Sequence, residues 1–287
     1  MAEIGEGVAI GVIDDRHDEE CPYCKCAKEK PEKIENDLVA DIDEDAPGFD
    51  GPLGNNSGKL GTACKDDKPS PQTIDDVPVA LAAHHLIPGN AALGESALKS
   101  GNHLWKHGME HGNIGYNINS AANGVWLPGS YALHKTNVTK RNATTDRNAP
   151  SWKEQSLPER QEYAVLATLL YGAQFHDSHK DYNEFVRRVL DKIAAKLEYA
   201  KGLNCPEATT SGEKPPGERP PLKVIVSRLN KLSKRMKGML TRPDPVRWRK
   251  NIYTSDKYGP TCLNRACGAP VTHDADADQL VKEIGFL

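Results

Sequence analysis

Two adjacent histidines, His84 and His85, close an apolar stretch that reads VPVALAAHHL. The composition and length of this stretch predict a strand that ends at the two histidines. Because successive side chains on a strand point to opposite faces, the two imidazoles would lie on opposite sides of it. They are therefore either two polar surface residues or two parts of a site with different tasks.

A second pair of histidines, His176 and His179, lies in the segment QFHDSHKDY. Apolar residues at helical spacing predict a long helix over 178–201, and Ser178 followed by Asp181 resembles a capping box at its start. Two imidazoles three residues apart at a helix start can converge on one metal ion. A solvated helix cap is the alternative interpretation of the same pattern.

Few elements are needed to position these four histidines. The segment NGVWLP, 123–128, predicts a second short strand, and apolar spacing predicts a helix over 159–172. A further amphipathic helix runs from Leu222 to Met239. We therefore expect an α+β fold with more helix than strand, in which the helices pack around a small ββα core.

The order of these elements is that of a ββα-metal nuclease, with His-His ending one strand, Asn opening the next and two histidines starting a helix. The segments AHHLIPGNAAL, NIGYNINSAANGVWLPGSYALH and QFHDSHKDYNEFVRRVL resemble the AHH family of the HNH/endonuclease VII superfamily. The resemblance covers about residues 78–200. It implies a DNase of a kind that is often a bacterial toxin, including type VI secretion effectors.

The resemblance also implies roles for single residues. His84 would be a metal ligand, and His85 would be the general base that takes a proton from water. Asn123, which matches the middle Asn of HNH, would orient His85 or coordinate the metal, and His176 and His179 would complete the metal site. An imidazole-rich site suits Zn²⁺ or Ni²⁺, while the resemblance points to Mg²⁺ or Mn²⁺ as the working ion.

Three further histidines, His103, His107 and His111, recur at intervals of four residues. If 96–111 is helical, they share one face, and His103 and His107 could bind a metal. Gly108 and Gly112 weaken that helix. We interpret the three as a polar or substrate-facing surface, with a metal role as the alternative.

The seven cysteines are an odd number, which argues against a framework made of disulfides alone. Clustered cysteines in a reducing compartment are more often metal ligands. A structural zinc site could be built from CPYCKC and CLNRAC, with Cys26 or Cys64 able to replace a member. Its four ligands would be Cys21, Cys24, Cys262 and Cys267. Reduced thiols without a metal are the alternative.

Charge is distributed unevenly along the chain, although the net charge is only −3. Residues 1–50 hold 16 acidic and 5 basic side chains, whereas 222–250 hold 10 basic side chains and one acid. This asymmetry suggests a polyanion partner or an acidic segment that shields a basic one. A solvated amphipathic helix is the alternative for the basic segment. The candidate DNA contacts are Lys234, Arg235, Arg247 and Arg249, with Trp248 as a stacking group.

Composition divides the chain into four parts. Residues 1–70 are acidic, contain cysteines and predict mostly loop; 71–205 hold the AHH-like nuclease unit. The segment PEATTSGEKPPGERPP, 206–221, reads as a linker or exposed loop. Residues 222–287 form a basic C-terminal segment.

No apolar run approaches the ~20 residues that a membrane span needs, so we expect no membrane partner. The acidic, glycine-rich start lacks the features of a signal peptide, so we expect synthesis in a bacterial cytoplasm. The resemblance implies delivery by a secretion system into the cytoplasm of a target cell. It also implies an immunity protein, and a secretion-system component is a further candidate partner.

These observations favour a metal-dependent, largely sequence-nonspecific DNA endonuclease with a histidine general base, acting as an antibacterial toxin. One alternative is a non-catalytic nucleic-acid-binding module that contains zinc. The other is a secretion adaptor with a degenerate nuclease domain. The presence of all five residues of the motif argues against degeneracy. They are His84, His85, Asn123, His176 and His179.

Overall fold

The computed structural model describes residues 56–100, 116–145, 149–203, 224–241, 248–267 and 274–285. These residues form short helices, two long helices and two small antiparallel sheets. None of the helices in these ranges combines the length and the apolar character that crossing a bilayer requires. The predicted α+β fold, mostly helical with a small strand component, is confirmed.

The central element is a pair of antiparallel strands, β3 (Ala80–His85) and β4 (Gly124–Gly129). The register pairs Ala80 with Gly129 at one end and His85 with Gly124 at the other. The two predicted strands are therefore present, and the first ends at the histidines as expected. A smaller pair, β1 (Thr73–Ile74) and β2 (Val77–Pro78), precedes them.

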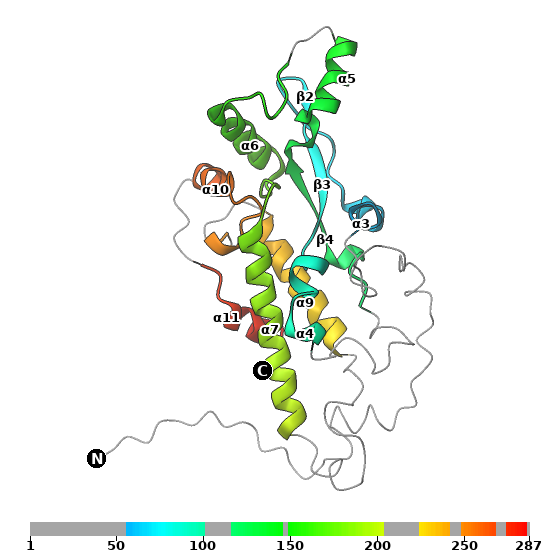
Figure 1. The fold of residues 1–287 in the computed structure, drawn as a ribbon, viewed down its shortest axis with the longest axis vertical. Helices are drawn as coiled ribbons and strands as arrows, with labels where there is room; N and C mark the ends of the chain where they lie inside the picture. The colour runs from blue at the N-terminus through cyan, green and yellow to red at the C-terminus, as the bar shows by residue number, and fades with distance from the viewer. Residues whose placement is uncertain are drawn as a thin grey trace, which may run out of the picture.

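Helices lie on both sides of the β3–β4 pair (Figure 1). The helix α3 (Ser57–Ala63) packs on β3, and α6 (Leu157–Tyr171) contacts β4 from the other side. The long helix α7 (Lys180–Leu203) packs against α4 (Ala97–Ser100) and the π-helical turn η3 (Gly89–Leu93). The predicted helices over 159–172 and 178–201 thus correspond to α6 and α7.

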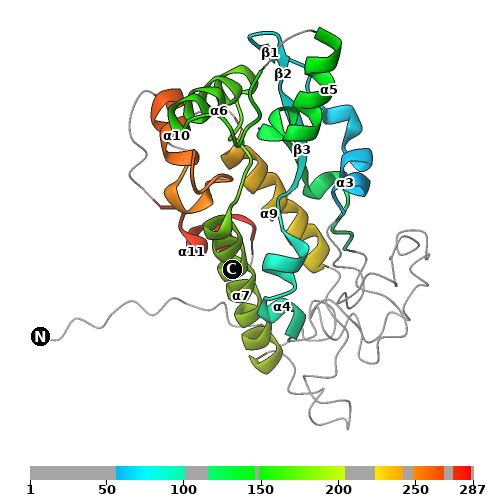
Figure 2. The same cartoon turned by 45° about the horizontal axis from the view of Figure 1, so that its top comes forward.

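The turned view shows α9 (Val224–Leu240), which contacts β4 and the short helix η4 (Ala121–Asn123) (Figure 2). Its apolar stripe is buried, as its spacing predicts, and it joins one core with the buried face of α7. Because that core also takes in β4 and the residues that follow β3, the C-terminal segment is packed against the strand pair. The α9 members of the core are Ile225, Leu229, Leu232, Met236 and Leu240.

A second core lies between α6, α10 (Gly259–Cys267) and the short helices η5 (Ser130–Leu133) and α5 (Lys135–Thr145). Its centre is aromatic, because the rings of Trp152, Tyr163, Phe175 and Tyr258 meet at centroid distances of 5.4–6.3 Å. Such contacts add roughly 0.5–1.5 kcal/mol per pair beyond burial. The second core therefore fixes the segment that enters α7.

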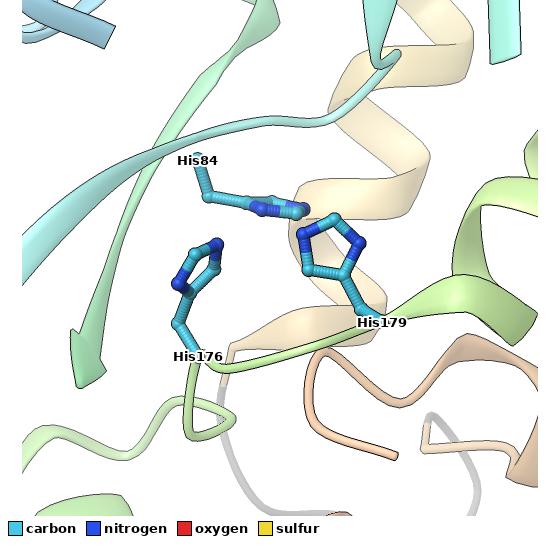
Figure 3. A group of neighbouring side chains, drawn as sticks. All are labelled: His84, His176 and His179. Carbon is cyan, nitrogen blue, oxygen red and sulfur yellow. The ribbon is translucent and has the colours of Figure 1, made fainter. Parts of the chain in front are cut away.

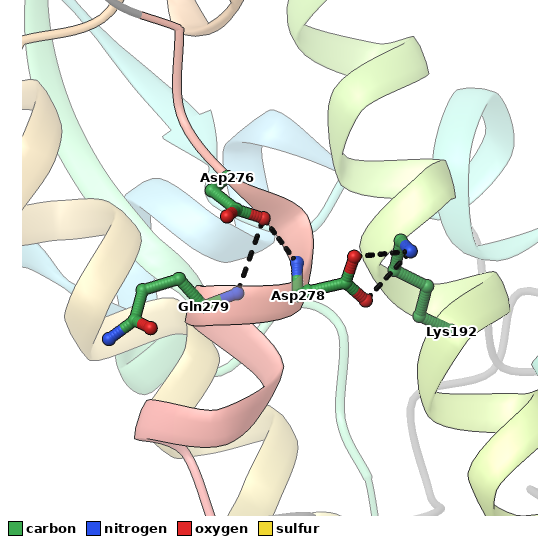
Figure 4. Close-up of polar contacts among 4 residues, drawn as sticks. All are labelled: Lys192, Asp276, Asp278 and Gln279. Carbon is green, nitrogen blue, oxygen red and sulfur yellow. Dashed lines mark hydrogen bonds and ion pairs between the residues drawn. The ribbon is translucent and has the colours of Figure 1, made fainter. Parts of the chain in front are cut away.

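The last helix, α11 (Ala277–Glu283), is fastened to α7 (Figure 4). The carboxylate of Asp276 caps it by accepting from the backbone N–H groups of Asp278 and Gln279. The Nζ atom of Lys192 on α7 lies 2.7 Å and 2.9 Å from the two carboxylate oxygens of Asp278. The apolar side of α11 completes the main core through Leu280, Val281 and Ile284.

Residues 57–63 differ from the expectation of mostly loop before residue 70. They form α3, which buries Leu60 and is followed by the buried Cys64. A helix of seven residues is marginal in isolation. Its stability therefore comes from packing on the strand pair, a contact that the local sequence pattern does not contain.

Candidate metal centre and active site

The segment that leads into α7 lies beside the end of β4. The backbone N–H of His176 donates to Pro128 O at 2.7 Å, and Gly129 and His176 form a parallel bridge. Because β4 is paired with β3, this bridge places His176 across from the strand that carries His84. Histidines more than 90 residues apart in sequence are thereby brought together.

Three imidazoles converge at this point: His84 from β3, and His176 and His179 from the segment before α7 (Figure 3). One ligand atom of each lies within 4.8 Å of the others. The ring centroids are 5.0–5.2 Å apart. The three histidines predicted as metal ligands could therefore hold one ion.

The chemistry of the cluster also fits a metal. His84 is 3% exposed, and its Nε2 atom has no hydrogen-bond partner among the described residues. Leaving a buried polar atom without a partner costs about 1–3 kcal/mol. A divalent ion bound by three imidazoles would supply that partner.

Outer partners hold two of the three rings. The Nδ1 atom of His176 lies 3.2 Å from the hydroxyl of Tyr131, and Nδ1 of His179 lies 3.1 Å from Oδ1 of Asn183. These contacts occupy Nδ1 and leave Nε2 of each ring for a ligand bond. Partners of this kind fix the tautomer and orientation of metal-binding histidines.

The cluster is neutral in this environment. Burial lowers the pKa of His84 well below its usual value, and the neighbouring His179, His176 and His85 lower it further. Burial, followed by the effect of His179, lowers the pKa of His176 to about 3. Burial also lowers the pKa of His179, against the opposing effect of its bond to Asn183. Neutral imidazole is the form that binds metals.

His85 lies on the other face of β3 and has separate contacts. Its Nε2 atom lies 2.9 Å from Oδ1 of Asn119, and its side chain is 7% exposed. Burial lowers the pKa of His85, and the hydrogen bond to Asn119 acts in the opposite direction. The imidazole is therefore neutral near pH 7 and able to accept a proton.

One cleft of about 480 Å³ joins the two faces. The three clustered histidines and His85 all line it, together with Leu81, Ala82 and Ala83 of β3. Tyr131 lines it on the His176 side and Trp126 lines it beside α3. A single substrate in this cleft could contact both sets of imidazoles.

The start of α7 is capped from the C-terminal segment. The backbone N–H of Lys180 donates to Oδ2 of Asp256 at 2.9 Å, and the N–H of Asp256 donates to Ser178 O at 2.7 Å. The sequence pattern instead suggested a cap formed by Ser178 and Asp181. The carboxylate of Asp256 takes the capping position, which ties the two metal-site histidines to the C-terminal segment.

Asn123 does not have the contact with His85 that the motif suggests. It is completely buried, and its amide makes four hydrogen bonds to Ile87, Ile118 and Ser233. These use both donors and both lone pairs of the amide, so none remains for His85 or a metal. Asn123 instead fastens the segment that follows β3.

The cysteine zinc site is not supported at Cys262. This residue is 1% exposed, belongs to the second core, and is a free thiol. Burial raises its pKa to about 11, whereas a zinc ligand is a thiolate. Cys64, the suggested substitute, is also a buried free thiol. Cys21, Cys24, Cys26 and the side chain of Cys267 lie outside the described residues.

The candidate DNA contacts near the C-terminus have different environments. Trp248 is fully buried and so cannot stack on a base. Nε of Arg235 on α9 lies 2.6 Å from Oε2 of Glu283, and a guanidinium nitrogen of Arg249 donates to Trp248 O. Lys234 is exposed on α9. Arg247, like His103, His107 and His111, lies outside the described residues.

Three residues around the site were not identified from the sequence: Asn119, Tyr131 and Asn183. Asn183 could have been found, because it lies four residues after His179, at the spacing that brings side chains together in the first turn of a helix. Asn119 and Tyr131 follow no periodic pattern. They reach the site only through the folding of the segments beside β4.

The comparisons with known proteins agree with this geometry. Residues 73–202 match a family model described as a nuclease family of the HNH/ENDO VII superfamily with conserved AHH. The triplet of that description is Ala83-His84-His85. No curated protein and no solved structure matches the chain. The matched segment contains β3, β4, the start of α7 and all four histidines of the cleft, so the part of the chain that carries the site is similar to the AHH family of nucleases.

Proposed function

We propose that this chain is a metal-dependent DNA endonuclease in which His84, His176 and His179 hold the ion and His85 is the general base. One observation carries the proposal. A three-histidine cluster and a fourth, separately held imidazole lie on opposite faces of one strand and line one cleft. Hydrolysis of a phosphodiester needs both kinds of group close to one phosphate.

The role of His85 follows from its neutral state and its position in the cleft. A ring nitrogen takes a proton from water as the water oxygen attacks phosphorus. The bond from phosphorus to the 3′-oxygen breaks, and the departing oxygen takes a proton from solvent water, which leaves a 5′-phosphate and a 3′-hydroxyl. A positioned base of this kind contributes about 10²–10⁴-fold to the rate.

The metal has a distinct role. When bound, a divalent ion stabilises negative charge on the phosphate and on the departing oxygen. The three imidazoles suit Zn²⁺ or Ni²⁺ as ligands, and Mg²⁺ and Mn²⁺ are the other candidates. Tyr131 and Asn183 keep two of the ligand rings oriented.

Substrate selection would rest on the sugar-phosphate backbone. Such contacts position a duplex without reading its sequence, so we expect little sequence preference. Lys68 supports this, because its Nζ atom lies 4.7 Å above the ring of Trp126, which lines the cleft. A cation at that place would attract a phosphate group.

We also propose that the enzyme is an antibacterial toxin, delivered by a secretion system into the cytoplasm of a target cell and neutralised by an immunity protein. The support is the resemblance to AHH nucleases that act in this way. Induced expression without an inhibitor should then degrade the host nucleoid and stop growth, while a His85→Ala chain should leave both intact. Normal growth of cells that express the wild-type chain would contradict the toxin role.

The nuclease itself is tested with supercoiled plasmid. Wild-type and His85→Ala proteins are incubated with Mg²⁺, Mn²⁺, Zn²⁺, Ni²⁺ or EDTA. The proposal expects nicking or degradation by the wild type only, and its loss in EDTA. If a folded wild-type protein cleaves with none of the ions but still binds DNA, the non-catalytic binding module replaces the endonuclease. RNA of similar length, assayed in parallel, tests the preference for DNA.

A further inference from the structure

The helix α3 lies outside residues 73–202, yet it covers the His85 face of the strand pair. The approach is close. A Cβ atom on Gly61 would lie 3.2 Å from the Trp126 ring, and one on Gly124 would lie 3.1 Å from Leu60 and Cys64. The indole N–H of Trp126 also donates to Cys64 O at 2.8 Å. This helix is therefore packed against the wall of the cleft.

A hydrogen-bonded chain connects α3 to His85. The backbone N–H of Asn56, the residue that caps α3, donates to Oδ1 of Asn119 at 3.0 Å. The same Oδ1 atom lies 2.9 Å from Nε2 of His85. Asn119 thus stands between a backbone group outside the family segment and the imidazole on β3.

The backbone donor settles the orientation of the Asn119 amide. An amide oxygen and nitrogen are otherwise hard to distinguish, and the hydrogen-bond network decides between them. Because a backbone N–H needs an acceptor, the atom facing Asn56 and His85 is the oxygen. An oxygen accepts only, so Nε2 of His85 must carry a proton. In a neutral imidazole the other nitrogen, Nδ1, is then the one able to accept a proton.

We propose that Asn119, held by the Asn56 N–H at the start of α3, is a positioning residue that keeps His85 in the Nε2–H form with Nδ1 as the basic nitrogen. The proposal rests on the proposed function, since it assigns how the general base of that nuclease is prepared. It makes α3 a part of the active site.

The donor in this chain is itself fixed. The side chain of Asn56 accepts from the N–H of Lys59 at 2.9 Å, which holds Asn56 in the capping conformation of α3. Its backbone N–H therefore points at Asn119 for as long as α3 is folded on the strands. Preorganisation of this kind lowers the cost of orienting the base during the reaction.

Two substitutions at Asn119 separate positioning from structure. Asn119→Leu has a similar volume but no acceptor, while Asn119→Asp keeps oxygens that can accept from both donors. We expect kcat on plasmid to fall about 10–100-fold in Asn119→Leu, by analogy with partners that orient metal-binding imidazoles. KM and the affinity for Zn²⁺ should not change, because the metal cluster lies on the other face of β3. Asn119→Asp should restore kcat to within a few-fold of wild type.

A spectroscopic measurement tests the proton position without substrate. Long-range ¹H–¹⁵N correlation spectra of the full chain, labelled at histidine, report the tautomer, and the His85→Gln spectrum assigns the signal. The proposal expects Nε2–H in the wild type and in Asn119→Asp, and a mixed or reversed tautomer in Asn119→Leu. A wild-type His85 that carries its proton on Nδ1 would overturn the proposal, even if Asn119→Leu does not fold.

The kinetic outcomes are equally decisive. An unchanged kcat in Asn119→Leu would overturn the positioning role, as would a parallel loss of Zn²⁺ affinity that points to general disruption. Asn90→Ala, at an exposed residue that does not line the cleft, should behave as wild type. If the wild type cleaves with none of the ions, the nuclease proposal fails, while the tautomer spectra still decide how Asn119 holds His85.

Discussion

His84 and His85 are neighbours in sequence, yet their imidazoles lie on opposite faces of β3 and have different partners. His84 meets His176 and His179, with ring centroids 5.1 Å and 5.0 Å away, whereas His85 meets Asn119. The alternation of a strand produces this separation directly. One step along the backbone therefore separates a three-histidine cluster from a fourth imidazole inside a single cleft.

The outer partners of the metal cluster should affect metal binding. Tyr131→Phe removes the hydroxyl beside Nδ1 of His176, and Asn183→Ala removes the acceptor beside Nδ1 of His179. We expect each to weaken Zn²⁺ binding about 10–100-fold in a calorimetric titration. Tyr171→Phe is the matched control, because its hydroxyl bonds Ser70 and Gln72 away from the site. Equal affinities in all three variants would refute the outer-partner role.

Acid should destabilise the metal-free protein. The pKa of His176 is lowered to about 3 and that of His84 is also lowered, so the folded state resists protonation. The unfolded chain takes up these protons below its histidine pKa of about 6.5. Stability is therefore present above pH 6.5 and is lost as the pH falls toward 3, by up to about 1.4 kcal/mol per pH unit for each such histidine.

Urea unfolding in EDTA at pH 7 and pH 5 checks this expectation. The free energy of unfolding should be lower at pH 5, and His176→Ala should show a smaller difference between the two conditions. An equal free energy at both values would mean that the cluster protonates as readily in the folded state as in the unfolded chain.

Asn123 should contribute mainly to the stability of the fold, not directly to catalysis. Asn123→Ala leaves the N–H and C=O of Ile87 and the C=O of Ile118 without their partner. Each unsatisfied buried group costs about 1–3 kcal/mol, so we expect a loss of roughly 3 kcal/mol or more in urea unfolding. The exposed Asn90→Ala should change stability by less than about 0.5 kcal/mol. A stable Asn123→Ala protein that fails only in cleavage would favour a direct catalytic role.

Substitution of two lysines, Lys68 and Lys234, distinguishes two candidate DNA-binding surfaces. Lys68 lies over Trp126 at the cleft, whereas Lys234 is on the exposed side of α9, which does not line the cleft. A lysine that contacts one phosphate contributes about one unit to the slope of affinity against salt. We expect Lys68→Ala to raise KM and reduce that slope, and Lys234→Ala to do neither. The reverse result would place the duplex along α9.

The predictable part of this site depends on local periodicity. The strand that ends at His84-His85 and the helix that follows His179 are both indicated by patterns within about ten residues. The resemblance to the AHH family adds the prediction that these two elements lie together at one metal site. Those features are present in the structure. His176 is held beside β4, the strand that pairs with the one that carries His84.

The remainder depends on contacts that have no local signal. The carboxylate of Asp256 caps a helix 76 residues earlier, and the N–H of Asn56 reaches Asn119 across 63 residues. Trp248, between two arginines, suggested a nucleic-acid surface, but tertiary packing buries it. Neither composition nor spacing carries information about such long-range partners.

The most direct test of the account compares single substitutions at the two neighbouring histidines. Zn²⁺ affinity is measured by calorimetry, and plasmid cleavage is measured with the ion that supports wild-type activity, for His84→Ala and His85→Ala. The account predicts that His84→Ala loses both metal binding and cleavage. It predicts that His85→Ala keeps wild-type metal affinity but loses cleavage by about 10²–10⁴-fold. Loss of metal binding in His85→Ala, or full activity in either variant, would contradict the division of roles across β3.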